Sequence, residues 1–212
     1  MISAFGKQWG PTREQVSVVE GRLAGTNERK RKKLASSITS MGIQLHVTVK
    51  EEVFMSTTDI LEKSHTLALQ SIEGLPEAEW DVPGVCGDWS VKDILAHLAT
   101  YEKLLVEVFK TFSGAPPGAY IARCRADQQA FNAAEVEARK YLTAQQVENE
   151  YNEGQIQSTA LLAKIPAEML QKTGTLSWYD PNSCLADFLQ MIYQHTSEHC
   201  SQIALFRERR HV

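Results

Sequence analysis

The sequence has no apolar run that approaches the ~20 residues needed for a membrane-spanning helix. Its amino terminus shows no apolar stretch followed by a cleavage site of small residues, so a secreted protein is not expected. Its four cysteines lie far apart, without the paired spacing of a zinc ribbon or the density of a disulfide framework. These absences predict a cytoplasmic protein with reduced cysteines and no membrane partner. The cysteines are Cys86, Cys124, Cys184 and Cys200.

An excess of positive charge is also missing. The chain has 22 Lys and Arg residues against 26 Asp and Glu, which gives a net charge of -4 and a pI near 5.9. A protein of this charge has no general attraction for nucleic acids or anionic membranes, and neither is expected as its main partner. Hydrophobic residues make up 43% of the 212 residues, which is enough to form a core.

The first 54 residues differ in charge from the rest of the chain. They hold nine basic and five acidic residues, a net charge of +4, whereas residues 55–212 hold 13 and 21, a net charge of -8. Five of the basic residues form one run, Arg29 to Lys33, which is more typical of a solvated segment than of a nucleic-acid or import signal. We expect residues 1–54 to be a flexible or poorly ordered extension, or to result from a start assigned too far upstream, and the folded domain to begin at Met55.

Residues 55–212 show helical periodicity and almost no strand pattern. Ser90 with Asp93 and Thr143 with Gln146 are capping-box pairs, and Ser183 is expected to cap the last helix. This pattern predicts an all-α four-helix bundle. The four amphipathic segments cover about 57–73, 90–112, 143–165 and 183–210, and a weakly amphipathic helical stretch covers about 119–141.

Two histidines occupy the apolar face of the last predicted helix. Phe188, Ile192 and Ile203 recur there at helical spacing, and His195 and His199 fall on the same stripe. Side chains four residues apart on a helix lie one turn from each other, at a spacing that lets two imidazoles bind one metal ion. The alternative is a pair of half-buried polar residues with ordinary hydrogen-bond partners.

A third histidine, His97, lies between Ile94 and Tyr101 on the inner face of the second predicted helix. If the second and fourth helices are neighbours, three imidazoles can converge on one ion. A fourth position then stays open for water or substrate, as in catalytic zinc sites. Zinc, nickel and iron(II) all accept imidazole ligands.

Spacing excludes two other kinds of metal site. A zinc protease of the HExxH type needs Glu directly after the first histidine, and position 196 is Thr. A di-metal carboxylate bundle needs Glu three residues before a histidine, and positions 94, 192 and 196 are Ile, Ile and Thr. Haem bound by His97 and one of the pair stays open as an alternative, without a supporting signature.

The aromatic residues near these positions are assigned mainly structural roles. Trp89 and Trp178 are expected to anchor loops onto the core, and His65 is expected in the core or at its rim. Tyr101 lies one turn beyond His97 on the same face, so it is the first hydrogen-bonding neighbour expected for a bound ligand.

Three further side chains are placed by helical periodicity alone. Glu102 and Glu198 are expected on the solvated sides of their helices, with support of a metal ligand from behind as the alternative for either. Ile156 is expected on the inner face of the third main helix.

The residues around the three histidines resemble a known family. Gly87-Asp-Trp-Ser-Val-Lys-Asp-Ile-Leu-Ala-His97-Leu, followed by Tyr101-Glu102, resembles the second-helix signature of the DinB-like (DinB/YfiT-type) metal-binding four-helix bundles. The same signature occurs in the amino-terminal domain of mycothiol-dependent maleylpyruvate isomerases. Tyr193-Gln-His195-Thr-Ser-Glu-His199-Cys-Ser-Gln202-Ile203 is similar to the family's fourth-helix segment. The resemblance covers about residues 56–210.

The resemblance implies one divalent ion, commonly zinc or nickel, on His97, His195 and His199, and often a homodimer. Known activities in the family include thiol-dependent transfer or isomerisation and hydrolysis of a reactive small molecule. No carboxy-terminal domain of the maleylpyruvate isomerase kind follows the fourth helix, so that isomerase activity is not expected. We expect a metal-dependent enzyme that activates a low-molecular-weight thiol or water towards a small electrophile. A metal-holding bundle without turnover and a plain dimerising bundle are the alternatives.

Overall fold

The computed structural model describes residues 57–212. The predictions of an amino-terminal extension over 1–54 and of a domain start at Met55 lie outside the described residues. The described part is helical, with one isolated bridge between Cys86 and Trp89. It confirms the predicted all-α class and bundle. None of its helices combines the length and apolar character needed to cross a membrane.

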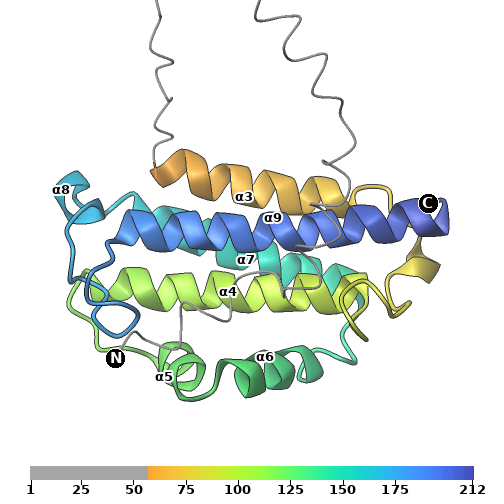
Figure 1. Ribbon diagram of the computed structural model, residues 1–212, viewed down its shortest axis with the longest axis horizontal. Coiled ribbons are helices and arrows are strands. Elements are labelled where there is room, and N and C mark those ends of the chain that lie inside the picture. Colours follow the sequence, from red (N-terminus) through yellow and green to blue (C-terminus); the bar gives the residue numbers. More distant parts are fainter. Residues whose placement is uncertain (1–56) are drawn as a thin grey trace, which may run out of the picture. The chain divides into compact units, whose positions relative to one another are not determined.

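Four long helices form the bundle (Figure 1). α4 packs mainly against α7, and α3 packs mainly against α9. α3 and α9 run in one direction and α4 and α7 in the other, because the chain returns between α4 and α7 through a crossover (Figure 1). The bundle helices are α3 (Thr57–Ile72), α4 (Val91–Thr111), α7 (Ala144–Leu162) and α9 (Leu185–Arg210).

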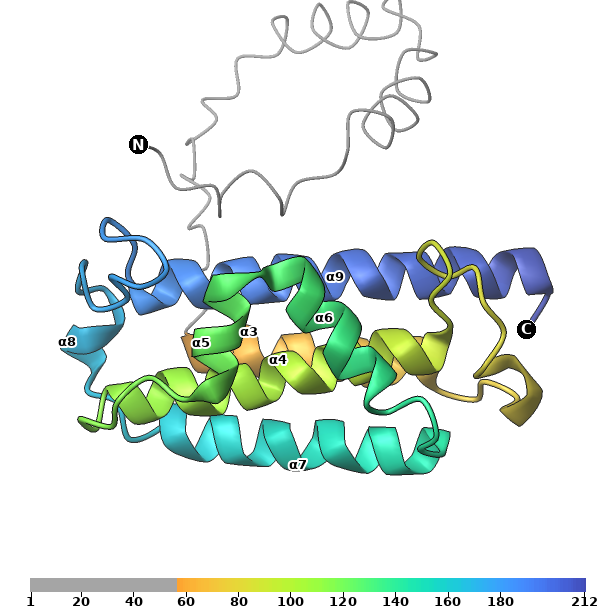
Figure 2. The same cartoon turned by 90° about the horizontal axis from the view of Figure 1, so that it is seen from below.

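The crossover contains two shorter helices that lie against α4 (Figure 2). They are α5 (Ala119–Ala126) and α6 (Gln128–Glu137), which together cover most of the helical stretch predicted over 119–141. Asp127 separates them, because its backbone is extended and its side chain caps α6 by accepting from the Ala130 N–H at 3.0 Å. A short turn η2 (Glu77–Glu79) precedes α4, and α8 (Ala167–Leu170) precedes α9.

Both predicted capping boxes are present. The Ser90 hydroxyl accepts from the Asp93 backbone N–H at 3.2 Å, and the Asp93 carboxylate accepts from the Ser90 backbone N–H at 2.9 Å. Thr143 and Gln146 make the same reciprocal bonds at 3.2 and 2.8 Å. These bonds satisfy amide groups that have no partner within the helix, so the starts of α4 and α7 are determined locally.

The prediction that Ser183 caps the last helix is wrong by one residue. The residue before α9 is Cys184, whose backbone N–H donates to the Asp187 carboxylate at 3.0 Å. The Ser183 hydroxyl donates instead to Asp180 in the preceding loop, also at 3.0 Å. Asp187 supplies the acceptor three residues into the turn, so a serine at the cap position is not required.

The core lies between the four long helices, and the inner faces predicted for α4 and α9 are buried. One predicted inner residue of α7 is not, since Ile156 is 66% exposed. At that level the inner face of α7 carries Gly154 and Ser158 instead. A Cβ at Gly154 would lie 2.7 Å from the Cβ of Glu102, so α7 approaches α4 too closely for a large side chain. Small residues therefore occupy this part of the interface.

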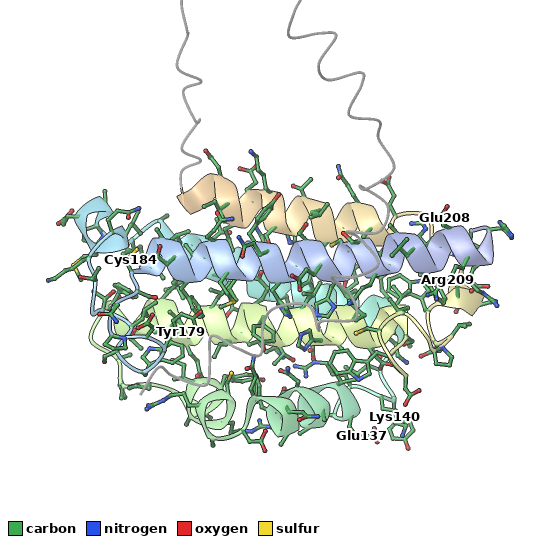
Figure 3. All side chains as sticks on the ribbon, in the orientation of Figure 1. Glu137, Lys140, Tyr179, Cys184, Glu208 and Arg209 are labelled. Carbon is green, nitrogen blue, oxygen red and sulfur yellow. The ribbon has the colours of Figure 1, made fainter. Side chains whose placement is uncertain are left out.

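Arginines at the end of α9 tie that helix to the segment between α3 and α4. Arg207 donates to the backbone carbonyls of Ser71 and Glu73 at 3.0 and 2.9 Å, where α3 ends. Arg209, which lies at the opposite end of α9 from Cys184 (Figure 3), donates to the Gly84 carbonyl at 3.0 Å. These bonds satisfy carbonyl groups at a helix end and in a loop, and they hold the loop before α4 in place.

Candidate metal centre

α4 positions His97 in the interior of the bundle. The capping box at Ser90 begins the helix two turns earlier, and His97 then lies on the same face as buried Ile94 and Tyr101. Its side chain is only 2% exposed. A buried imidazole at this position must be satisfied from neighbouring helices, because the amides and carbonyls of its own helix are already bonded.

α9 brings the other two histidines to the same place. His195 and His199 are one turn apart on α9, and His199 is 9% exposed. The Nε2 atom of His97 lies 2.9 Å from the Nε2 atom of His195, which in turn lies 3.0 Å from the Nε2 atom of His199. All three candidate ligand atoms lie within 4.8 Å of one another. The predicted convergence of three imidazoles is therefore confirmed, and their binding of a metal stays a prediction.

Hydrogen bonds between neutral imidazoles cannot account for all of the short contacts in this cluster. A neutral imidazole carries one N–H, and the Nδ1 atom of His199 lies 2.8 Å from the Oε1 atom of Gln202, an acceptor. If His199 donates there, its Nε2 presents a lone pair to His195. The single Nε2 atom of His195 cannot serve both of its short contacts as a donor. One cation placed among the three lone pairs attracts all of them, and nitrogen ligands of one zinc at about 2.0–2.1 Å have a mutual spacing of roughly 3 Å.

The electrostatics of the site also fit a cation-binding donor set. Burial lowers the pKa of His97 well below its usual value, and the neighbouring His195 and His199 lower it further. Burial, followed by the charge of His199, does the same to the pKa of His195. The pKa of His199 is lowered by burial, although its bond to Gln202 opposes the shift. All three rings are thus neutral at neutral pH, the form that binds a metal.

Two aromatic rings of α4 and its preceding loop border the cluster. The centroid of the Trp89 ring lies 5.0 Å from that of His97, and the Tyr101 ring lies 4.8 Å from both His97 and His195. Trp89 was expected only to anchor a loop, but it also forms part of the wall of this site. The expected role is correct for Trp178, which packs against Phe188 at 5.9 Å.

The hydroxyl of Tyr101 is held by α6. It donates to the Asn132 side-chain oxygen at 3.2 Å and accepts from the Gln128 side-chain amide at 3.1 Å. Burial raises the pKa of Tyr101, so its hydroxyl keeps its proton at neutral pH. The sequence placed Tyr101 correctly beside His97 but contained no signal for its partners, since the packing of α6 on α4 is a tertiary contact. Gln202 did have a signal, because it follows His199 by three residues on the same helix face.

The expectation that Glu102 is solvated is wrong. Glu102 is 4% exposed in the α4–α7 interface, and the Ser158 hydroxyl donates to its Oε2 atom at 2.7 Å. Burial raises the pKa of Glu102 to about 7, although the bond from Ser158 opposes this. Glu198 is exposed, as expected.

His65 is at the rim of the core, as expected, and lies outside the cluster. Its ring stacks on Tyr151 at 5.1 Å, and it lines a groove of about 780 Å³ between α3 and α7. None of the three clustered histidines lines this groove. Among the described residues, the only group of three or more histidine, cysteine or acidic side chains that could hold a metal ion is His97, His195 and His199.

Comparisons with known proteins agree with this architecture. A family model described as the DinB superfamily matches residues 60–203, a range that includes all three histidines. The fold is similar to a crystal structure of a protein from Streptococcus pneumoniae, with a TM-score of 0.60 and 13% sequence identity. That match covers 72% of this chain and 88% of the other, and at this identity the likeness concerns the fold alone. No curated protein matches the sequence.

Proposed function

The chain belongs to the DinB superfamily, and on that premise we propose that it is a metal-dependent enzyme whose ion is held by His97, His195 and His199. The observation that carries the proposal is the set of Nε2 contacts at 2.9 and 3.0 Å among three neutral imidazoles that are buried or half-buried. Three protein ligands are typical of catalytic zinc sites, whereas structural zinc sites have four. Zinc or nickel is the proposed ion.

The proposed reaction is attack of a low-molecular-weight thiol, or of water, on a small electrophile. A divalent ion in such a site lowers the pKa of a coordinated thiol or water and so supplies the nucleophile at neutral pH. The sulfur–carbon bond forms as the bond to the leaving group breaks, and the thiol proton passes to solvent. We also propose that the protein is a homodimer, which light scattering of the purified chain would test.

Residues of the chain prepare the site for this chemistry. Gln202 orients His199, and the rings of Trp89 and Tyr101 cover the cluster on the α4 side. Tyr101 keeps its proton and donates it in a hydrogen bond to Asn132, so it does not act as a base. Tyr101 therefore does not take the proton of the thiol or water, and the lowered pKa of the nucleophile would have to come from the ion.

Metal content of the purified protein tests the proposed site. We expect about one zinc or nickel ion per chain, and loss of that ion in His195→Ala. The matched control is His65→Ala, which removes a histidine that lies outside the cluster and should keep the ion. If His195→Ala is folded and retains its metal, the three histidines are not the ligands.

Turnover is tested separately, with a simple thiol and an electrophilic aryl chloride as probes. We expect thiol consumption and chloride release that disappear on chelation and return with added zinc or nickel. A non-catalytic metal-holding bundle is the second candidate, favoured by the protonated state of Tyr101. The second candidate would be supported if the protein binds the thiol in a metal-dependent way but releases no chloride. This must hold both with the thiol and with water alone as the nucleophile.

A further inference from the structure

Gln202 lies one turn beyond His199 on α9 and faces its ring. Its side chain is half-buried, and its Oε1 atom lies 2.8 Å from the Nδ1 atom of His199. We propose that Gln202 is a positioning residue that keeps the His199 proton on Nδ1. The Nε2 lone pair of His199 then points into the cluster. This inference rests on the proposed function, because it gives Gln202 a role toward the ion that the three histidines would hold.

The two neutral tautomers of His199 have opposite consequences for the site. With the proton on Nδ1, the ring donates to Gln202 and offers a lone pair at Nε2. With the proton on Nε2, the ring directs an N–H toward the Nε2 atom of His195, which is 3.0 Å away. Only the first tautomer can bind a metal through Nε2. A side-chain acceptor fixed beside Nδ1 therefore selects the competent form before any ion arrives.

His97 does not have a comparable side-chain anchor. Its Nδ1 atom is buried and has no hydrogen-bond partner among the described residues, whereas the Nδ1 atom of His199 does. Of these two histidines, only His199 thus has a side chain beside Nδ1 that can fix its tautomer. Residues that orient metal-bound histidines in this way typically change metal affinity by about 10–100-fold when they are removed.

The tautomer of His199 can be measured in the metal-free protein. We would record imidazole 15N spectra at neutral pH with a chelator present, and assign His199 by comparison with His199→Asn. Wild type and Gln202→Glu should show the Nδ1–H form, because both side chains offer an oxygen acceptor. Gln202→Leu, which has similar size and no acceptor, should shift the population toward Nε2–H. An Nε2–H form in wild type, or an unchanged spectrum in Gln202→Leu, would overturn the proposal.

Zinc affinity provides a second readout, measured by competition with a chromophoric chelator. Gln202→Leu should bind zinc about 10–100-fold more weakly than wild type, and Gln202→Glu should bind at least as tightly. The matched control is Gln194→Leu on the same helix, which removes an exposed glutamine next to His195 and should leave affinity unchanged. Equal affinity of Gln202→Leu and wild type would exclude a positioning role toward the ion.

The two measurements also separate this inference from the proposed function. If wild type binds neither zinc nor nickel, the proposed function fails, and the tautomer spectra still decide whether Gln202 orients His199. If wild type binds zinc but the spectra of Gln202→Leu and wild type agree, the metal site stands and the positioning role does not. A purely structural role for Gln202 would lower the stability of Gln202→Leu and of Gln202→Glu without the difference in zinc affinity between them.

Discussion

Replacing Glu102 with Gln should stabilise the folded protein at alkaline pH. Glu102 is 4% exposed, and burial raises the pKa of its carboxyl group from 4.5 to about 7. Gln has nearly the same shape and keeps an oxygen that can accept the bond from Ser158, which is 2.7 Å long in wild type. It differs in that it cannot ionise. The variant therefore removes the buried charge and leaves the packing of α4 on α7 intact.

The magnitude follows from the difference in proton affinity between the folded and unfolded states. Because the folded-state pKa of Glu102 is the higher one, its proton stabilises the folded state fully below pH 4.5, and this stabilisation is lost as the pH rises through about 7. A shift of this size corresponds to about 3 kcal/mol. Between these pH values the free energy of unfolding of wild type should thus fall by up to about 3 kcal/mol relative to that of Glu102→Gln. Below them the two proteins should be nearly equal in stability.

Urea unfolding followed by circular dichroism, over a series of pH values and with a chelator present, measures this difference. The titration of the clustered histidines affects wild type and variant equally, so it cancels when the two free energies of unfolding are subtracted. Glu153→Gln is the matched control, since Glu153 is exposed on α7 and its replacement should change little at any pH. If Glu102→Gln is the less stable protein at alkaline pH, or if the difference does not vary with pH, the carboxylate is not a destabilising buried charge.

Three further variants test the packing around α4 and α9. Gly154→Ala should lower the free energy of unfolding in urea by about 1–3 kcal/mol, because its Cβ would lie 2.7 Å from the Cβ of Glu102. A gain in stability, as Gly→Ala gives in an exposed helix, would show that α4 and α7 can move apart freely. Arg207→Ala should lower the free energy of unfolding by about 1–2 kcal/mol, because its bonds to Ser71 and Glu73 are lost. Arg125→Ala, at an exposed position, is the control and should change it very little. Equal effects of the two substitutions would contradict the assigned bonds. Tyr101→Phe should keep its metal content and lose about 1 kcal/mol of stability, since the ring stays and the bonds to Asn132 and Gln128 go; loss of the metal would make the hydroxyl a ligand.

Features set by local chemistry could be predicted from the sequence. The capping boxes at Ser90 and Thr143 each involve only four consecutive residues, so both partners of each box can be identified from the sequence. The cluster was predictable for a similar reason. His97, His195 and His199 each interrupt an apolar stripe, and two stripes that face one core bring such residues together. Binding of one ion by all three is the part of the prediction that no local pattern tests.

The errors at Glu102 and Ile156 have one tertiary cause. α7 lies against α4 so closely that Gly154 contacts Glu102, which buries a second side of α4 and turns Ile156 outward. Helical periodicity identifies one apolar face for each helix, and it assumes that the opposite face is solvated. That assumption fails for α4, because α7, α9, α5 and α6 all contact it. As a result, 16 of its 21 residues are buried.

A helix buried on several sides must satisfy its polar side chains within the protein, and α4 does so with one exception. Thr100 donates to the Ala96 carbonyl at 3.0 Å, the buried ammonium of Lys92 donates to the Lys140 carbonyl at 3.1 Å, and Glu102 accepts from Ser158. His97 differs, because its Nε2 atom faces another imidazole and its Nδ1 atom has no hydrogen-bond partner within residues 57–212. A buried polar group without a hydrogen-bond partner costs free energy, so its presence in a folded protein needs an explanation such as a function. The Nε2 atoms of His97, His195 and His199 face one another, and one divalent ion among them would accept a lone pair from each of the three rings.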